Sequence, residues 1–383
     1  MVLGVDNPST LRVVFLLTGL DVGGAEQQVV NLAVALRLRG WQVGVISLLP
    51  LKALADDLRH AGVVVETLHM RRGVPDPRAV WALARILRQW KPDVLHSHMV
   101  HANILGRITR LLQNVPVLIS TAHSINEGGR WREVAYRLTD GLADVTTNVS
   151  HAATERYIRI GVAPEAKIMT VPNGVDIAKF ALNPALARPL LDSLGVTNEF
   201  VWLAVGRLES PKDYPTLLSA FKIANAASQS AKLLVAGHGP LMPDMIQLTA
   251  KLGLSQKVLF LGVRRDVPAL MNVADAYVMS SVYEGLPMAL LEAAASGLPI
   301  VATNVSGNSE AVPRDGGYLV PPGDAEALAE AMVRVMALTA AERQSMGEAG
   351  RRHVEDNYSL GTVVARWEMV YFDMLSRKTS VKG

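Results

Sequence analysis

Residues 276–303 read AYVMSSVYEGLPMALLEAAASGLPIVAT, and this stretch decides the fold class. An apolar, β-rich run at 276–279 is followed by a polar loop, a helical run at 288–296 and a second apolar run at 300–302. A strand, a helix and a second strand in this order are typical of a parallel sheet covered by its helices. The stretch therefore predicts an α/β fold.

The same alternation extends in both directions over most of the 383 residues, a length that suits two domains. Apolar runs predict a first series of strands at 11–17, 42–49, 63–68, 94–96, 117–120 and 145–148, with helices at 25–39, 77–90 and 130–142. A second series has strands at 201–205, 232–236, 258–261, 276–279 and 300–302, with helices at 214–225, 241–252, 288–296, 324–336 and 340–356. Two Rossmann-like, doubly wound domains follow from this pattern.

The boundary between the two series falls at Pro172-Asn173-Gly174-Val175-Asp176, where Pro and Asn-Gly interrupt regular structure. We expect an N-terminal domain at 1–176 and a C-terminal domain at 177–360. The segment 361–383 is predicted to be a helix that either closes the second domain or crosses back onto the first. Two sheet edges facing each other would form a cleft in which two substrates meet.

Composition narrows the class of protein. The chain contains no cysteine, which excludes disulfides, thiolate zinc sites and cysteine nucleophiles. No uncharged apolar run approaches the ~20 residues of a membrane-spanning helix, and no signal peptide is recognised. A soluble, cytoplasmic protein is expected.

Positive charge is concentrated in the first domain. Residues 1–176 contain 19 Lys and Arg against 15 Asp and Glu, whereas residues 177–383 contain 19 against 20. The excess lies between Arg71 and Arg110, and a second basic stretch contains Arg130-Trp131-Arg132 and Tyr136-Arg137. These residues form either an ordinary solvated face or a surface for anionic lipid headgroups or an anionic acceptor. Nucleic acid is disfavoured because no nucleic-acid motif is present.

The segment from Glu284 to Glu292 carries the strongest chemical signal. Pro287 suits the first helical position, and the amides of Met288 and Ala289 would then offer a helix start to a phosphate. Glu284 precedes the helix and Glu292 lies about one turn inside it, so the two carboxylates can bind hydroxyl groups at different parts of one elongated ligand. The alternative is a buried helix start with two solvated glutamates.

A pair of cations, Arg207 and Lys212, follows the strand predicted at 201–205. Such a pair can bind a diphosphate from two sides, although an ion pair of Arg207 or Lys212 with Glu209 or Asp213 would be the ordinary alternative. The sequence contains no Asp-x-Asp pair, which is a common way to hold Mg²⁺ against a diphosphate. No metal and no cofactor are therefore expected.

Two further groups of residues follow strands of the first domain. Gly23 and Gly24 precede a helix and would let the backbone approach an anion, but they form no G-x-G-x-x-G fingerprint, which argues against a dehydrogenase. His96, His98 and His101 follow one strand and His123 follows the next. Three of these histidines could form a zinc site, but they are expected instead to line the edge of the cleft as hydrogen-bond donors.

In this order and spacing, the motifs resemble those of the GT-B retaining glycosyltransferases of the family 4 type. The resemblance covers nearly the whole chain, and its most specific element is the E-x7-E segment from Glu284 to Glu292, continued by AAASGLPIVAT at 293–303. Supporting motifs are GGAE at 23–26, DVLHSH at 93–98, NGVD at 173–176, GRL at 206–208 with Lys212, GHGP at 237–240 and LG at 261–262.

The resemblance implies a role for each matching residue. Arg207 and Lys212 would bind the diphosphate, with the Gly23-Gly24 loop closing over it. Glu292 would hold the ribose hydroxyls and Glu284 those of the transferred sugar, while His123 would lie near the reacting anomeric carbon. The sugar and distal phosphate would contact the backbone of Leu286, Pro287, Met288 and Ala289, and the base would lie near Val263 and Arg264.

This chain departs from the family pattern at two positions. His238 stands where many members have an acidic residue, which puts recognition of the base in doubt. Asp213 replaces the glycine that often follows the lysine, so a stiffer loop is expected.

The resemblance implies a retaining, metal-independent hexosyltransferase that uses a nucleotide diphosphate sugar. UDP is the favoured nucleotide, with GDP-mannose second, and a lipid-linked or polysaccharide glycan is the expected acceptor. An anionic membrane surface is a further expected partner, at the inner face of the cell membrane. The alternatives are a GT-B nucleotide-sugar epimerase or hydrolase and a non-catalytic nucleotide-sugar-binding protein.

Overall fold

The computed structural model describes residues 11–21, 23–126, 128–181, 187–227 and 230–380. The chain divides into two units, and the first of them is discontinuous in sequence. Unit 1 comprises residues 1–174 and 360–383, and unit 2 comprises residues 175–359. Each unit contains a single sheet whose paired strands are all parallel.

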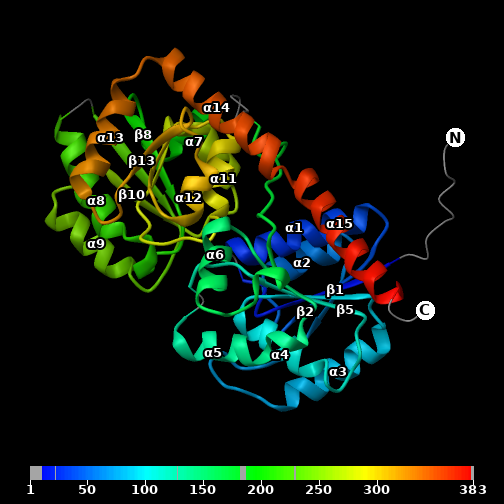
Figure 1. The fold of residues 1–383 in the computed structure, drawn as a ribbon. Helices are drawn as coiled ribbons and strands as arrows, with labels where there is room; N and C mark the ends of the chain where they lie inside the picture. Colours follow the sequence, from blue (N-terminus) through cyan, green and yellow to red (C-terminus); the bar gives the residue numbers. More distant parts are fainter. Residues whose placement is uncertain (1–10, 22, 127, 182–186, 228–229, 381–383) are drawn as a thin grey trace, which may run out of the picture. The chain divides into compact units, whose positions relative to one another are not determined.

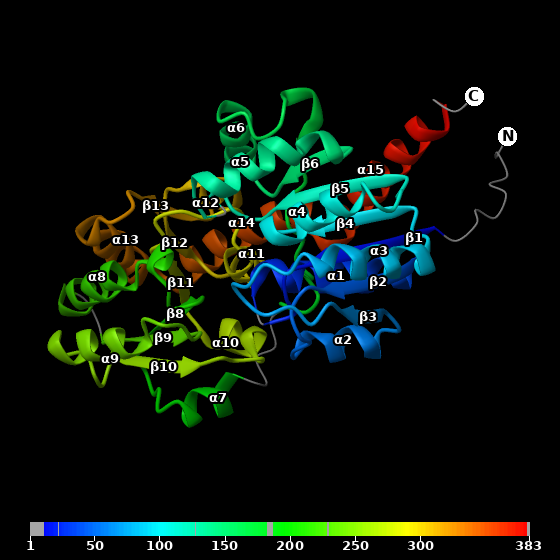
Figure 2. The same ribbon diagram turned by 90° about the horizontal axis from the view of Figure 1, so that it is seen from below.

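The sheet of unit 1 has seven strands in the order β3-β2-β1-β4-β5-β6-β7, and Figure 2 labels this order from β3 to β6. Its interior strands are almost wholly buried, as expected for strands covered on both faces. The strands are β1 (Arg12–Leu17), β2 (Gln42–Ser47), β3 (Val64–Thr67), β4 (Val94–His98), β5 (Val117–Ala122), β6 (Val145–Asn148) and β7 (Ile168–Thr170).

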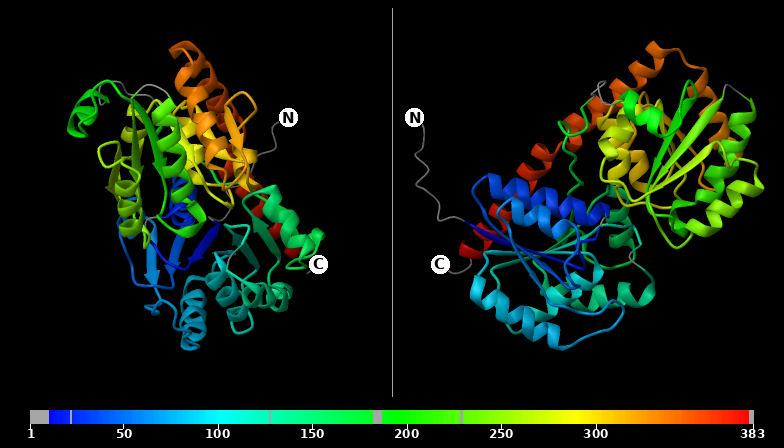
Figure 3. Two further views of the ribbon diagram at one scale, coloured as in Figure 1. Left: turned by 90° about the vertical axis from the view of Figure 1, so that its left-hand side faces the viewer. Right: turned by 180° about the vertical axis from the view of Figure 1, so that it is seen from behind.

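Two layers of helices cover this sheet. On one face, α1 (Gly24–Leu38), α2 (Leu54–His60) and α15 (Leu360–Ser380) pack in one apolar cluster with the strands. On the other face lie α3 (Arg78–Trp90) and α4 (Val100–Thr109), with α5 (Arg130–Thr139) beside α4 (Figure 1). The remaining helix of the unit is α6 (His151–Arg159). Figure 3 shows α15, in red, on the side of the sheet that also carries α1.

Unit 2 repeats the same arrangement with six strands in the order β10-β9-β8-β11-β12-β13. The strands are β8 (Phe200–Val205), β9 (Ala231–Ala236), β10 (Val258–Gly262), β11 (Ala276–Met279), β12 (Ile300–Thr303) and β13 (Gly317–Val320). The helices are α7 (Ala187–Ser193), α8 (Tyr214–Ala227), α9 (Met242–Lys251), α10 (Val267–Val273), α11 (Met288–Ala295), α12 (Ser306–Ala311), α13 (Ala325–Ala337) and α14 (Ala340–Tyr358). Residues of α8, α9 and α13 share one core with the strands.

The predicted parallel sheets are confirmed, and every predicted strand is present within three residues of its expected ends. The structure differs from the predicted elements in two respects. The helix predicted at 130–142 ends at Thr139 and continues only as a 3₁₀ turn at Asp140–Leu142. The short strands β7 and β13, and the helices α2, α4, α6, α7, α10 and α12, were not predicted.

Candidate functional site

Several predicted site residues follow the strands at which each sheet reverses its strand order. This reversal occurs between β1 and β4 in unit 1 and between β8 and β11 in unit 2. Loops that leave the carboxyl ends of such strand pairs are the usual ligand-binding position of open parallel sheets. In unit 2, β8 leads into Gly206 and Arg207, and β11 leads into Ser280, Ser281 and Glu284.

Lys212 and Glu284 meet directly at the reversal point of unit 2. The Lys212 ammonium donates a hydrogen bond of 2.5 Å to Glu284 Oε1, and the Ser281 hydroxyl donates one of 2.6 Å to the same oxygen. Both charged side chains are largely shielded, with 24 % and 12 % of their surfaces exposed. Ser281 was not predicted as a site residue, although a polar side chain just after a buried strand was an available signal.

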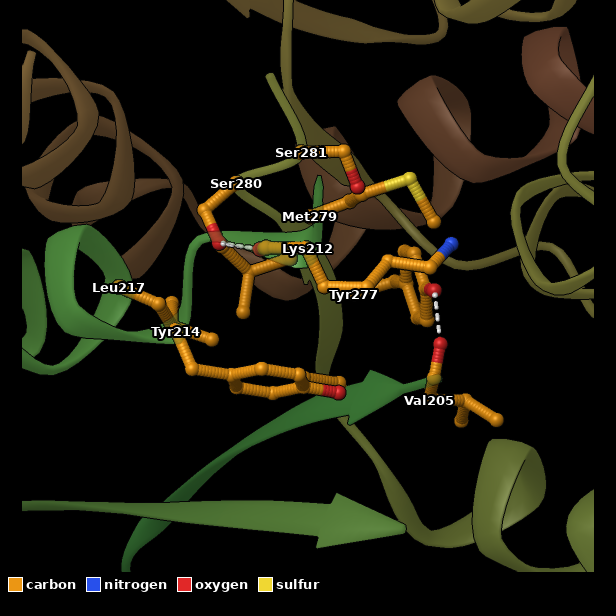
Figure 4. A pocket seen from close by; sticks show the side chains of 10 residues that line it. Val205, Lys212, Tyr214, Leu217, Tyr277, Met279, Ser280 and Ser281 are labelled. Carbon is orange, nitrogen blue, oxygen red and sulfur yellow. Dashed lines mark hydrogen bonds between the residues drawn. The ribbon is translucent and has the colours of Figure 1, made fainter. Parts of the chain in front are cut away.

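Hydrogen bonds hold the loop that carries Lys212 in place. The Ser280 hydroxyl donates to the carbonyl oxygens of Lys212 and Asp213 at 2.8 and 3.0 Å, and Figure 4 shows Ser280 pointing to this turn. Asp213 adopts a left-handed conformation with φ of 46°, which explains why a glycine would suit this position. Below the turn, the Tyr214 hydroxyl donates to the Gly206 carbonyl at 3.1 Å.

Glu292 lies on the same side of the unit, in the second turn of α11. Burial raises the pKa of its carboxyl group to about 7, and the positive charge of Lys179 opposes this rise only in part. Tyr277 of β11 links the two carboxylates: burial raises the pKa of its hydroxyl well above the usual value, and the negative charges of Glu284 and Glu292 act in the same direction. Both carboxylates are therefore close enough to Tyr277 to influence it.

The helix α11 begins at Met288 as predicted, but Pro287 does not occupy the first helical position. Pro287 is the residue before the first helical one, with extended backbone, and Met288 is the first helical residue. Among the described side chains, none caps this helix start. The side chains of Leu286 and Met288 are buried, so only their backbone is oriented for a ligand. The loop is backed by α12, where a Cβ on Gly307 would overlap the carbonyl of Gly285.

Arg207 is not drawn into this cluster. Its guanidinium is 63 % exposed and lies 3.4 Å from Glu209, the ordinary ion pair that the sequence left open. Of the predicted donor-binding residues in unit 2, Lys212 and Glu284 are in contact, while Arg207 lies at the exposed surface.

Val263 and Arg264 follow β10, the edge strand of the same sheet. Val263 is exposed, and Arg264 forms a two-point contact with Asp266, with Nε donating to Oδ1 at 2.7 Å. The guanidinium lowers the pKa of Asp266. His238 is exposed in the neighbouring loop after β9. These residues are thus accessible, but Arg264 is already engaged by a carboxylate.

In unit 1, Gly23 is the residue before α1, and Gly24 begins the helix. A Cβ on Gly23 would overlap the carboxylate of Glu26, which therefore lies against the start of its own helix. An acid in the first turn interacts favourably with the helix dipole. An anionic ligand at this position would have to share it with Glu26. Val22, which lies in the same loop, falls outside the described residues.

Two of the four histidines, His96 and His98, are buried instead of lining an edge of the sheet. His96 is fully buried, with Nδ1 2.8 Å from the Tyr371 hydroxyl of α15 and Nε2 2.7 Å from the Thr121 hydroxyl. His98 is also buried, and its Nδ1 lies 2.9 Å from Nε2 of His123. His101 is exposed on α4. No group of three or more His, Cys, Asp or Glu in the described residues is arranged to hold a metal ion.

The basic surface of unit 1 is smaller than the sequence indicated. Arg107 is fully buried and donates to the hydroxyls of Ser120 and Thr146 at 3.1 and 2.8 Å. Arg110 lies 2.7 Å from Asp144, and the Tyr136 ring is buried. Arg107, Arg110 and Tyr136 are engaged within the unit. They therefore do not contribute to the basic surface that the sequence predicted. No helix in the described parts of the chain has both the length and the apolar content required to cross a bilayer.

Comparison with known proteins gives two family matches that lie side by side along the chain. Residues 192–353 match the model described as Glycosyl transferases group 1, and residues 22–179 match Glycosyltransferase Family 4. Each match lies largely within one of the two series of strands and helices.

Curated relatives agree with these matches. The UDP-Gal:alpha-D-GlcNAc-diphosphoundecaprenol alpha-1,3-galactosyltransferase of Escherichia coli is 29 % identical over 343 residues, covering 86 % of this chain and 88 % of the relative. A GDP-mannose-dependent alpha-(1-6)-phosphatidylinositol monomannoside mannosyltransferase of Mycobacterium tuberculosis is 28 % identical over 245 residues, covering 61 % and 63 %.

Among solved structures, Anabaena Alr3699/HepE in complex with UDP and glucose has a TM-score of 0.84 and 20 % identity. The match covers 95 % of this chain and 100 % of that one. At this identity the likeness establishes the shared GT-B fold, with its two parallel-sheet domains.

Proposed function

We propose, from the premise that the chain belongs to the glycosyltransferases of the GT-B, family 4 type, that it is a retaining, metal-independent hexosyltransferase. As a member of this family it acts on a nucleotide sugar. The proposed donor is a UDP-sugar, with GDP-mannose second, and the proposed acceptor is a hydroxyl group of a lipid-linked or polysaccharide glycan.

The observation that carries this proposal is the contact between Lys212 and Glu284 at the carboxyl end of the sheet, where the negative charges of Glu284 and Glu292 both raise the pKa of Tyr277. Without a ligand, Lys212 is neutralised by Glu284. A donor diphosphate would bind the Lys212 ammonium in place of Glu284. Glu284 could then accept hydrogen bonds from the sugar, while Glu292 binds the ribose. Arg207 supplies a second, exposed cation, and the amides of Met288 and Ala289 supply the helix start.

The reaction needs charge stabilisation rather than covalent chemistry from the protein. The bond between the anomeric carbon and the diphosphate oxygen breaks, and its electron pair leaves with the nucleoside diphosphate. Lys212, Arg207 and the α11 start stabilise that negative charge. The acceptor oxygen attacks from the same face, and its proton passes to the departing phosphate. In this proposal Val263 and Arg264 flank the base, the Gly23-Gly24 loop contacts the diphosphate, and His123 positions the reacting sugar.

Two variants test the separate roles proposed for Lys212, which binds the diphosphate, and Glu284, which binds the sugar. We expect Lys212→Ala to weaken UDP binding and to lower turnover at least ~100-fold, because it removes a contact to the leaving group. Glu284→Gln should lower turnover similarly but leave UDP binding equal or tighter, because UDP then displaces no carboxylate. Isothermal titration with UDP and single-turnover kinetics measure both effects. Turnover within a few-fold of wild type in a folded variant would remove that residue from the site.

The alternative activities differ in their need for an acceptor. An epimerase or hydrolase would convert the nucleotide sugar with no glycan present, and a non-catalytic protein would bind it without turnover. A thermal-shift screen against UDP, GDP and their sugars identifies the donor, because a ligand of the native state raises the melting temperature. Release of UDP from that donor, with and without a polyprenyl-diphosphate glycan, then separates the three activities.

The acceptor proposal is supported by an exposed surface on α3, α4 and α5 of unit 1, which we term the α3–α5 face. Trp131, Val134 and Leu138 are exposed at helical spacing on α5, with 87 %, 39 % and 81 % exposure. The helices α3, α4 and α5 together contain a single acidic residue, Glu133, which is paired with Arg156. The other exposed members of this face are Trp81, Ile108, Leu111, Leu112, Arg78, Arg85, Arg88, Arg130, Arg132 and Arg137.

Exposed Trp and Leu beside arginines fit the interface of an anionic bilayer, where apolar side chains enter the headgroup region and each cation adds about 1 kcal/mol. The Escherichia coli relative is named for transfer onto a diphosphoundecaprenol-linked sugar, which agrees with an acceptor held in a membrane. We therefore assign the α3–α5 face to the inner surface of the cell membrane.

Vesicle flotation tests this assignment. The wild-type protein should float with vesicles containing phosphatidylglycerol and remain unbound with neutral vesicles. Trp131→Ser combined with Leu138→Ser should abolish flotation, whereas Ile246→Ser, at a similarly exposed apolar residue of unit 2, should not. Equal flotation with both kinds of vesicle, or equal loss in both variants, would exclude this face as the docking surface.

A further inference from the structure

Ser281 is a fully buried residue in contact with the carboxylate proposed to bind the sugar. It follows β11 closely, and its hydroxyl lies 2.6 Å from Glu284 Oε1. A carboxylate only accepts hydrogen bonds, so the hydroxyl is the donor. Lys212 donates to the same oxygen at 2.5 Å, whereas the described residues supply no hydrogen bond to Glu284 Oε2.

Ser281 is held in place by bonds that do not involve the Lys212 side chain. The Thr303 hydroxyl of β12 donates to the Ser281 carbonyl at 2.6 Å, and Nδ2 of Asn308 in α12 donates to the Thr303 carbonyl at 3.0 Å. Both of these polar side chains are buried. The end of β11 is thus tied to β12 and α12, and Ser281 can stay where it is when Lys212 changes its partner.

The neighbouring serine holds the cation instead of the acid. The Ser280 hydroxyl donates to the carbonyls of Lys212 and Asp213, as described above. Figure 4 shows the side chains of Ser280 and Ser281 pointing in different directions, as successive side chains at the end of a strand do. Each of the two serines therefore holds one of the two charged residues, and only Ser281 does so at the charged group itself.

The Ser281 hydrogen bond matters most when Lys212 leaves Glu284. Under the proposed function, a donor diphosphate binds the Lys212 ammonium, and the carboxylate loses this partner. The Glu284 side chain is only 12 % exposed, and a shielded charge without a partner is unfavourable. Hydrogen bonds to charged groups are among the stronger ones in proteins. The remaining Ser281 donor therefore lowers the free energy needed to separate the ion pair.

We propose that Ser281 is a positioning residue for Glu284, a role that rests on the proposed function. It donates to Oε1 before and after the donor binds, and so favours the transfer of Lys212 to the diphosphate. It also fixes the orientation of the carboxylate, which leaves Oε2 to accept hydrogen bonds from the transferred sugar. Ser281 acts in both respects through Glu284.

A double-mutant cycle on nucleotide binding tests this role. We expect Ser281→Ala to weaken the binding of UDP, or of GDP if GDP binds more tightly, by roughly 3–10-fold, because Glu284 then has no donor besides Lys212. In Glu284→Gln no ion pair has to be separated, so the addition of Ser281→Ala should change the dissociation constant by less than about twofold. Titration calorimetry measures the wild type, both single variants and the double variant.

Ser296→Ala is the matched control. Ser296 is 1 % exposed at the end of α11, and its hydroxyl donates at 2.9 Å to a backbone carbonyl, that of Glu292. Its substitution removes the same group from an equally buried position and should leave nucleotide binding unchanged. Ser281→Cys separates packing from hydrogen bonding, because a thiol fills the position but donates weakly. It should bind the nucleotide as Ser281→Ala does, and it takes the place of that variant if Ser281→Ala does not fold.

Turnover is the second readout. We expect Ser281→Ala to lower kcat by roughly 10-fold, because the sugar is then held by a carboxylate whose orientation is no longer fixed. Ser296→Ala should keep the wild-type kcat. Melting temperatures confirm that each variant is folded.

The outcomes separate the role of Ser281 from the proposed function. Equal weakening of nucleotide binding by Ser281→Ala in the wild-type and Glu284→Gln backgrounds, or no weakening in either, would overturn the role of Ser281 and leave the proposed function standing. Nucleotide binding that Lys212→Ala leaves unchanged would instead contradict the proposed function, and the role of Ser281 with it.

Discussion

Glu292 is the proposed ribose-binding residue, and burial of its carboxyl group lowers the stability of the folded protein. Its carboxyl group is partly buried in α11, and burial raises its pKa from 4.5 to about 7. A carboxyl group whose folded pKa is raised binds its proton more tightly in the folded state than in the unfolded state. Glu292 therefore destabilises the fold increasingly as the pH rises from about 4.5 to 7, and fully above that range.

We predict that Glu292→Gln stabilises unit 2 at pH 8 by roughly 1–3 kcal/mol, because 1 pKa unit corresponds to about 1.4 kcal/mol. At pH 5, where the carboxyl group is protonated in the folded state but partly ionised in the unfolded state, the difference should fall to less than about 1 kcal/mol. Denaturant unfolding at both pH values measures this difference. Glu330→Gln, on an exposed face of α13, should be neutral at both. A Glu292→Gln effect of the same size at pH 5 and pH 8 would contradict the prediction.

At this scale the sequence predicted which residues carry charge at the ends of strands, but not their partners. Lys212 and Glu284 were placed at one sheet edge because parallel strands end together, and they do meet there. The Ser281 contact and the pairing of Arg207 with Glu209 depend on side-chain rotamers, which leave no periodic trace in a sequence. Arg107 was assigned to the surface because arginine is rarely fully buried.

The helix α4 is anchored to its sheet by that buried arginine. Besides its bonds to Ser120 of β5 and Thr146 of β6, Arg107 donates to the carbonyl of Tyr136 in α5 at 3.1 Å. Its guanidinium also lies 5.0 Å from the centre of the Tyr136 ring and 3.6 Å from Asp140. One side chain thus joins α4, α5 and two strands.

We predict that Arg107→Ala destabilises unit 1 by about 3–5 kcal/mol, the usual effect of removing one partner from a buried charged network. Arg85→Ala, which removes an exposed arginine of α3, should change the stability by less than about 0.5 kcal/mol. Scanning calorimetry measures both, and only the transition that belongs to unit 1 should move. Equal melting temperatures for the two variants would mean that Arg107 does not anchor α4.

The long helices with repeated apolar positions were predictable, whereas two short strands and several shorter helices were missed. The helices α1, α3, α13 and α14 were found within two residues at each end because apolar residues recur over several turns. The four-residue strands β3, β6, β11 and β12 were recognised from their apolar runs. The strands β7 and β13 have only three and four residues, and α12 has six, so each of them offers little periodicity. They form because the sheets they join are already in place.

At the scale of the whole molecule, the two units differ in how the chain forms them: unit 2 is continuous in sequence and unit 1 is not. All the described strands and helices of unit 2, from α7 to α14, lie in one continuous segment. Unit 1 is completed only by α15, whose Val363, Val364 and Tyr371 are fully buried against α1 and the sheet, with Trp367 at 3 % exposure. The helix also contributes Glu368, which accepts from the Trp41 indole at 2.9 Å.

We predict that residues 175–359 fold alone, whereas residues 1–174 do not. Complete burial of a large apolar side chain stabilises a protein by about 1.5–3 kcal/mol, so Val363, Val364, Trp367 and Tyr371 together contribute roughly 6–12 kcal/mol, as much as the total stability of a typical domain. Circular dichroism and thermal unfolding of each fragment measure this. Fragment 175–359 should also be stabilised by UDP, and its Lys212→Ala form should not.

Addition of the missing helix in trans identifies the cause of the difference. A peptide of residues 360–383 should restore cooperative unfolding to fragment 1–174, because it returns the apolar face that covers β1, β4 and β5. The same peptide with Trp367→Ala and Tyr371→Ala keeps its length but loses the two large rings, and it should fail to complement. The opposite result is cooperative unfolding of fragment 1–174 by itself, at the same temperature as unit 1 in the full chain. That result would show that α15 does not stabilise the core of unit 1, and it would contradict the prediction.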